Sequence, residues 1–146
     1  MRNKMKLEFT SNPENESLAR SCIAAFAAQM NPTVEQIIEL KTAVSEAITN
    51  AIVHGYAQQD GTVVLSAYIK DSRIHIQVSD KGCGIEDVEK AKQPFFTTAP
   101  EFERSGMGFS VMESFTDEVQ VISAPGQGTK VRMKKTIGVG ADDRKI

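Results

Sequence analysis

Hydrophobic and polar residues alternate in several short stretches of the chain. These stretches lie at residues 5–9, 63–69, 74–80, 119–122 and 129–137. A period of two places successive side chains on opposite faces, which is typical of strands with one buried face. Only a short polar turn separates the second stretch from the third, so these two are expected to form a β-hairpin. The pattern therefore predicts at least five strands.

Apolar residues recur at helical spacing in further stretches, at residues 13–30, 34–55, 86–92 and 108–115. Asn12 followed by Pro13 is typical of an N-cap and the first turn of a helix. Thr33 and Gln36 have the spacing of a capping box, which predicts the start of the second helix. Gly55 is expected to end that helix after about twenty residues.

The element order β-α-α-β-β-α-α-β-β predicts an α+β fold, an α/β two-layer sandwich with the helices on one face of about five strands. Because the hairpins are antiparallel and other strands need crossovers, a mixed, mostly antiparallel sheet is expected. A chain of 146 residues is long enough for one core. Residues 1–137 are therefore expected to form a single domain, and residues 138–146 a flexible C-terminal tail.

Composition narrows the functions that the chain can have. A net charge of −2 argues against direct nucleic-acid binding, which usually needs a concentrated basic excess. No apolar run approaches the roughly 18 residues of a membrane span, and the start lacks a signal-peptide core. A cytoplasmic protein without membrane contact is expected. Cys22 and Cys83 indicate neither a disulfide framework nor a zinc site, because they are only two, lack C-x-x-C spacing and have no histidine nearby.

The second predicted helix carries a polar pair on an otherwise apolar segment. Glu46 and Asn50 lie one turn apart, so their side chains share one side of the helix. A buried polar group without a partner costs about 1–3 kcal/mol. The pair is therefore expected either to meet a ligand or to lie along a helix edge that reaches solvent.

Two glycine pairs follow, one after a predicted strand at residues 80–84 and one before a predicted helix at residues 105–109. Glycine lets the backbone approach a ligand closely, and a helix N-terminus attracts phosphate. Neither a P-loop nor a dinucleotide-binding motif occurs. The second pair is a candidate phosphate site, although a glycine pair before a helix also occurs in ordinary tight turns.

The order of four short motifs resembles that of a known superfamily. The motifs are Glu46-x-x-x-Asn50, Asp80-x-Gly82-x-Gly84, Gly106-x-Gly108 and Gly128-Thr129. They are similar to the signature motifs of the Bergerat-fold, or GHKL, ATPases, which include gyrase B, sensor histidine kinases and MutL. Residues 15–20 and 93–109 most closely resemble the anti-sigma F factors of spore-forming bacilli. That family consists of small serine kinases that also sequester a sporulation sigma factor.

The resemblance implies a site for ATP or ADP with Mg²⁺. Asp80 would accept the adenine amino group, and Thr129 would support the same edge of the base. Asn50 would offer a neutral oxygen to Mg²⁺. Glu46 would orient and deprotonate an attacking hydroxyl near the γ-phosphate.

The resemblance also implies a lid at residues 95–103 that nucleotide orders. The remaining nucleotide contacts that it implies are Gly82, Gly84, Thr97, Thr98, Ser105, Gly106, Met107 and Gly108. Arg104 would neutralise charge in the transition state, although a solvated arginine at this position is an equal alternative.

The expected partners are a sigma factor, sigma F, an anti-anti-sigma factor as the serine substrate, and a second copy of the chain in a homodimer. Glu16 and Arg20 match positions where the family contacts the first two, but an ion pair four residues apart on a helix also explains them. Met5, Leu7 and Phe9 on an edge strand could pair across a two-fold axis or face the monomer core.

Other functions within the superfamily fit less well. The chain has only His54 and His75, both inside predicted elements, so histidine autophosphorylation is not expected. Two alternatives stay open, a kinase that controls a general-stress sigma factor and a nucleotide-gated sigma-binding module without phosphotransfer. Glu46 distinguishes a kinase from the nucleotide-gated module, because a module that only binds nucleotide does not need a general base at that position.

Overall fold

The computed structural model describes residues 2–57, 59–85, 87–92 and 108–138. The strands are β1 (Asn3–Thr10), β2 (Thr62–Lys70), β3 (Arg73–Asp80), β4 (Glu118–Ser123) and β5 (Thr129–Thr136). The helices are α1 (Asn15–Ala27), α2 (Val34–Thr49), α3 (Val88–Ala91) and α4 (Gly108–Phe115). A 3₁₀ turn at Ala28–Met30 follows α1, and a π-helix at Asn50–Gly55 continues α2.

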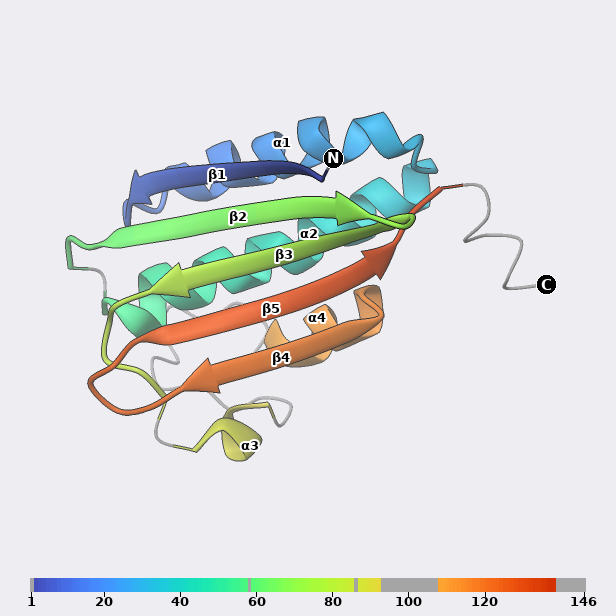
Figure 1. Ribbon diagram of the computed structural model, residues 1–146. Helices are drawn as coiled ribbons and strands as arrows, with labels where there is room; N and C mark the ends of the chain where they lie inside the picture. The colour runs from blue at the N-terminus through green and yellow to red at the C-terminus, as the bar shows by residue number, and fades with distance from the viewer. Residues whose placement is uncertain (1, 58, 86, 93–107, 139–146) are drawn as a thin grey trace.

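The strands form one sheet in the order β1-β2-β3-β5-β4, and every neighbouring pair is antiparallel. Figure 1 shows α1, α2 and α4 behind one face of this sheet, which confirms the predicted α+β two-layer fold. The expectation of a mixed sheet is wrong. Strands β3 and β4 run in the same direction, but they are not neighbours because β5 lies between them. Strand β2 is antiparallel to β1, because the α1–α2 pair returns the chain before β2 begins.

Local side-chain chemistry decides where the two long helices begin. The predicted capping box is confirmed, because Thr33 Oγ1 accepts the Gln36 N–H at 3.1 Å and Gln36 Oε1 accepts the Thr33 N–H at 3.0 Å. Asn12, in contrast, is not the N-cap of α1. Its Oδ1 accepts the N–H of Glu14 at 2.9 Å within a preceding turn, and Glu14 itself holds the N-cap position.

The predicted hairpin is confirmed, with Lys70 opposite Arg73 at the end of the β2–β3 ladder. Asp71 and Ser72 form the turn with φ values of 52° and 64°. Two successive left-handed residues are typical of a type I′ turn, whose twist matches that of the flanking strands.

The hydrophobic core lies between the sheet and the helix layer. Its largest fully buried side chains include Ile23, Leu40, Ile48, Leu65, Met112 and Met133. Phe9 is 8% exposed and belongs to this core, while Met5 and Leu7 pack against it. The apolar residues of the edge strand β1 therefore face the interior of the monomer. Within the described ranges, no helix has the length and apolar character needed to cross a bilayer.

Candidate functional site

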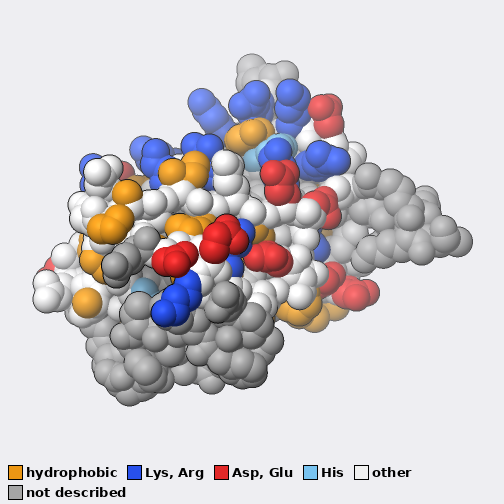
Figure 2. Space-filling view, turned by 90° about the horizontal axis from the view of Figure 1, so that it is seen from below, with side chains coloured by type: hydrophobic (Ala, Val, Ile, Leu, Met, Phe, Trp, Pro, Cys, Tyr) orange, Lys and Arg blue, Asp and Glu red, His pale blue; other side chains and the backbone are white. Residues whose placement is uncertain are grey.

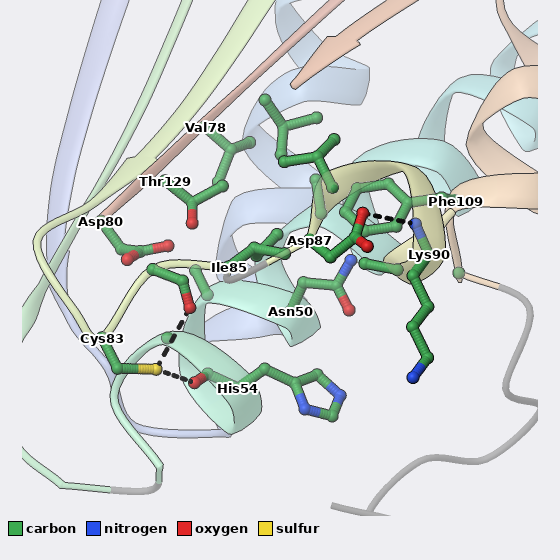
Figure 3. A pocket seen from close by; sticks show the side chains of 18 of the residues that line it. Asn50, His54, Val78, Asp80, Cys83, Ile85, Asp87, Lys90, Phe109 and Thr129 are labelled. Atoms are coloured by element: carbon green, nitrogen blue, oxygen red, sulfur yellow. Dashed lines mark hydrogen bonds between the residues drawn. The ribbon is translucent and has the colours of Figure 1, made fainter. Parts of the chain in front are cut away.

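A cavity of about 1030 Å³ lies where the C-terminal end of α2 meets the sheet and α4. Figure 3 shows side chains that reach it from the π-helix, β3, β5, α3 and the first turn of α4. Its apolar lining includes Val78, Ile85, Phe109 and Val131, and its polar lining includes Asn50, Asp80 and Thr129. The cavity therefore brings together five of the residues that the sequence motifs selected, namely Asn50, Asp80, Gly84, Gly108 and Thr129.

Asp80 is the most deeply buried carboxylate in the lining, with 8% of its surface exposed. Its Oδ1 accepts the N–H of Gly82 at 2.9 Å. Burial raises the pKa of Asp80, while backbone hydrogen bonds from Gly82 and Thr129 act in the opposite direction. The end of β3 thus holds a desolvated acceptor that is only partly satisfied by the backbone.

Gly55, at the end of the π-helix, packs directly against this carboxylate. A Cβ at Gly55 would lie 2.8 Å from Asp80 Oδ1, so only glycine fits without displacing the acidic side chain. The sequence patterns marked Gly55 as the end of a helix and did not indicate this contact.

Thr129 lies directly opposite Asp80 in the β3–β5 ladder. Its hydroxyl is 2.8 Å from Ser123 Oγ, which donates to the Gly128 carbonyl at 2.9 Å and accepts the Ile85 N–H at 2.8 Å. Because the Ser123 proton is used on Gly128, the Thr129 hydroxyl donates to Ser123 and keeps its oxygen as an acceptor. Ser123 therefore positions Thr129, although no sequence motif singled it out.

Gly82 and Gly84 approach protein backbone rather than open space. A Cβ at Gly82 would lie 1.9 Å from the Gly55 carbonyl oxygen, and one at Gly84 would lie 2.0 Å from that of Ala124. Gly84 also has a φ of +77°, which L side chains rarely adopt. These glycines allow three loops to close around the cavity, and Gly84 also lines it.

Cys83 lies between these glycines, and its N–H donates to the Gly55 carbonyl at 2.7 Å. Its exposed thiol lies in the cavity lining and donates to the His54 carbonyl at 3.1 Å. Figure 3 shows both residues at the same end of the cavity.

Glu46, Asn50 and Gly108 meet where α2 passes the N-terminus of α4. A Cβ at Gly108 would lie 3.2 Å from Glu46 Oε2 and 3.6 Å from both polar atoms of the Asn50 amide. Asn50 Nδ2 is buried and has no hydrogen-bond partner among the described residues. The polar pair of this helix therefore lies beside Gly108, the described glycine of the second glycine motif.

Asn50 is also the first residue of the π-helix, an irregularity that the helical pattern did not predict. Such turns occur frequently at functional sites. The residues Thr97, Thr98, Arg104, Ser105, Gly106 and Met107 and the expected lid lie outside the described part of the chain.

Comparison with known proteins gives one consistent assignment. The family model for the histidine kinase-like ATPase domain matches residues 9–135. Anti-sigma F factors from Thermoanaerobacter pseudethanolicus and Clostridium acetobutylicum are 57% and 51% identical to the chain. The alignments cover 93% and 97% of this chain, and 95% and 99% of the respective relatives. The chain belongs to the anti-sigma F factor family.

Solved structures show that this anti-sigma F family member shares its fold with more distant proteins. The RsbU and RsbW domains of a Mycobacterium tuberculosis protein superpose with a TM-score of 0.67 at 18% identity, covering 92% of this chain and 32% of that one. A mycobacterial sensor histidine kinase superposes with a TM-score of 0.56 at 15% identity, covering 92% of this chain and 97% of that one.

Glu16 and Arg20 lie on α1 of this family member, outside the cavity lining. Arg20 Nη1 is 3.2 Å from Glu16 Oε1, and the two side chains are 39% and 22% exposed. The structure therefore contains the intramolecular ion pair that is one explanation of these residues. Their contact with partners stays a prediction.

Proposed function

We propose that this chain is a Mg-ATP-dependent protein serine kinase that also binds a sporulation sigma factor, sigma F, and blocks its use in transcription. The observation that carries the kinase proposal is the buried Asn50 Nδ2, which has no hydrogen-bond partner among the described residues and lies beside Glu46 and Gly108. One cavity joins Asn50 to the buried acceptor Asp80. Membership of the anti-sigma F family supports the regulatory part.

Asp80 and Thr129 are proposed to bind adenine. The Asp80 carboxylate has acceptor capacity that the backbone leaves unused, so it can accept a hydrogen bond from the exocyclic amino group of adenine. This hydrogen bond would replace one that water cannot make to the buried carboxylate. The Thr129 oxygen is available as a second polar contact on the same edge, and apolar residues such as Val78 and Phe109 suit the faces of the base.

Asn50 fits the proposed role of Mg²⁺ ligand. The described residues contain no group of three His, Cys, Asp or Glu side chains that could hold a metal by themselves. Mg²⁺ is often bound by one or two protein oxygens together with phosphate oxygens and water. The oxygen and nitrogen of an asparagine side chain are assigned from the hydrogen bonds around them. Rotating the Asn50 amide group by 180° would place Oδ1 where the unpaired Nδ2 lies. When bound, Mg²⁺ would neutralise phosphate charge.

Glu46 is proposed as the general base. Its carboxylate lies beside the position of Gly108, where the N-terminus of α4 would face the terminal phosphates. In this position it would accept the proton of the attacking serine hydroxyl. Resemblance to the family adds Gly106, Met107, Ser105, Thr97 and Thr98 as phosphate or lid contacts and Arg104 as a second catalytic group.

The proposed substrate is an anti-anti-sigma factor, and Glu16 with Arg20 on α1 are proposed to contact both it and the sigma factor. These partners act in the cytoplasm, so the same compartment is proposed for this chain. We also propose a homodimer, since β1 lies at a sheet edge whose backbone can pair with a second copy.

Transfer of label from γ-labelled ATP to the anti-anti-sigma factor tests this proposal. Wild type with Mg²⁺ should label a serine. Glu46→Gln should bind nucleotide but lose about 100-fold or more in transfer rate, as expected for loss of a general base. Asp80→Asn should no longer bind nucleotide.

The second candidate function is a nucleotide-gated sigma-binding module, which the same assay separates from a kinase. If nucleotide binds and no label reaches the partner, the kinase proposal fails and the module is favoured. Equal transfer by wild type and Glu46→Gln would remove the proposed role of Glu46 alone.

A further inference from the structure

The sheet face that carries no helices is strongly basic. Its described cationic side chains are Arg2, Lys4, Lys6, Lys70, Arg73, Lys130, Arg132 and Lys134. Glu8 and Glu118 are the acidic side chains on the same alternate positions of the strands. The whole chain has a net charge of −2, so its positive charge is concentrated on this open face. Figure 2 shows Lys and Arg side chains gathered along the upper rim, where this face lies.

A groove of about 740 Å³ runs across the open face. Lys4 and Lys6 line it from β1, and Arg132 and Lys134 line it from β5. Two strands separate β1 from β5, so the two cationic rows are about 14 Å apart at the usual spacing between strands. The side chains between the rows are Ser66, Tyr68, His75 and Gln77. The groove therefore has two cationic walls, with Glu118 beside Lys134, and a floor of uncharged hydrogen-bonding groups with Arg2 over the Tyr68 ring.

The charges on this face are largely uncompensated. The ion pair described on it joins Lys134 Nζ to Glu118 Oε2 at 3.4 Å between side chains that are 43% and 60% exposed. The pKa of His75 is lowered by burial and by the nearby cations Lys134, Arg73, Arg2 and Lys70. A positive potential of this kind attracts anionic partners and excludes cationic ones.

We propose that this groove is a docking site for an acidic α-helix of a partner protein. A helix with side chains is about 10–12 Å in diameter, which fits between cationic rows about 14 Å apart. Carboxylates on its two flanks would meet Lys4 and Lys6 on one side and Arg132 and Lys134 on the other.

Features of the face argue against other occupants. Single-stranded nucleic acid depends on base stacking, but the Tyr68 ring already stacks on His75 and lies against Arg2, each 4.4 Å from its centroid. A second copy of the chain would oppose like charges. A membrane surface needs exposed apolar side chains for insertion, and among the large exposed apolar residues of the described chain only Ile122 lies in the sheet.

The open face lies on the opposite side of the sheet from the nucleotide cavity. Val78 and Val131 line the cavity, whereas their strand neighbours Gln77 and Arg132 line the groove. An occupied groove is therefore compatible with nucleotide binding, and the proposal does not depend on the kinase assignment.

Fluorescence anisotropy at low salt tests the proposal with an Ala-rich helical peptide that carries Glu on two flanks. The same peptide with Gln in place of Glu, poly-dT, and phosphatidylcholine vesicles containing phosphatidylserine serve as competing probes. The Glu peptide should bind, and Lys6→Gln with Arg132→Gln should weaken its binding roughly tenfold. A matched double variant, Lys41→Gln with Lys92→Gln, removes two cations from the helix side and should bind like wild type.

His75 provides a local readout in the same complex. Bound carboxylates would offset the surrounding cations, so the pKa of His75, followed by NMR, should rise when the Glu peptide is added. Circular dichroism establishes that the variants remain folded. The proposal is overturned if the Glu peptide does not bind, if poly-dT or the vesicles bind more tightly, or if both double variants weaken binding equally.

Discussion

Asp80 experiences two opposing effects at the scale of a single residue. Burial disfavours its charge, and Gly55 packs so closely against it that a side chain at position 55 would collide with the carboxylate. The same charge is the acceptor that the proposed adenine contact needs. A folded protein that keeps such a group without ligand trades stability for recognition.

We predict that Asp80→Asn stabilises the nucleotide-free protein at neutral pH while abolishing ATP binding. A raised folded-state pKa means that the native state binds more protons than the unfolded state, so the contribution of Asp80 is favourable in acid and is lost as pH rises through that pKa. The gain from Asp80→Asn should therefore shrink as pH falls toward the unfolded pKa. Urea unfolding at several pH values measures this difference, and a variant less stable than wild type at neutral pH would contradict the account.

Lys135 is a second buried charge, on the helix side of β5, with 8% of its surface exposed. Its Nζ donates to the Phe115 carbonyl at the end of α4 at 2.6 Å and lies 3.8 Å from Glu39 Oε1 on α2. Removing it would leave the partly buried Glu39, whose side chain is 18% exposed, without its cation. We predict that Lys135→Ala lowers the free energy of unfolding by about 3 kcal/mol or more.

Combining Lys135→Met with Glu39→Leu should recover much of this loss, because both charges then leave the core. Urea unfolding of the single and double variants checks the prediction. If Lys135→Ala alone unfolds with wild-type stability, the pair does not hold these elements together.

At the scale of elements, the meeting of α2 and α4 forms the proposed phosphate end of the site. The helical period predicted that Glu46 and Asn50 share one side of α2, because that relation depends only on spacing. It did not predict the π-helix that begins at Asn50, since the change of register depends on how the end of the helix packs on β3 and the glycine loops. The contact of Gly108 with both side chains is likewise a property of two elements far apart in sequence.

We predict that Gly108→Ala impairs phosphotransfer with little loss of stability. A Cβ there would lie 3.2 Å from Glu46 Oε2, so the carboxylate would have to shift by a few tenths of an ångström. Because a misplacement of about 1 Å can cost about 100-fold in rate, this smaller shift should cost severalfold, whereas alanine suits a helix better than glycine. The measurement is the transfer rate beside the melting temperature, with Ser110→Ala on α4 as control. Wild-type transfer by Gly108→Ala would contradict the proposed geometry.

At the scale of the whole molecule, the sheet separates two surfaces with different chemistry. The helix side holds the core and the nucleotide cavity, and the open side holds the concentrated cations. Alternating patterns and capping residues were sufficient to predict the strands, the helix order and the two-layer arrangement. They could not predict that the sheet is antiparallel throughout, because strand order depends on β5 entering between β3 and β4.

The most direct test of the central claim is the affinity for ATP with and without Mg²⁺, measured by calorimetry on wild type, Asn50→Ala and Glu46→Gln. If the cavity is a Mg-ATP site and Asn50 is its metal ligand, Mg²⁺ should tighten ATP binding to wild type and to Glu46→Gln. Asn50→Ala should lose roughly tenfold or more of that gain. An unchanged response to Mg²⁺ in Asn50→Ala, or no ATP binding by wild type, would contradict the account.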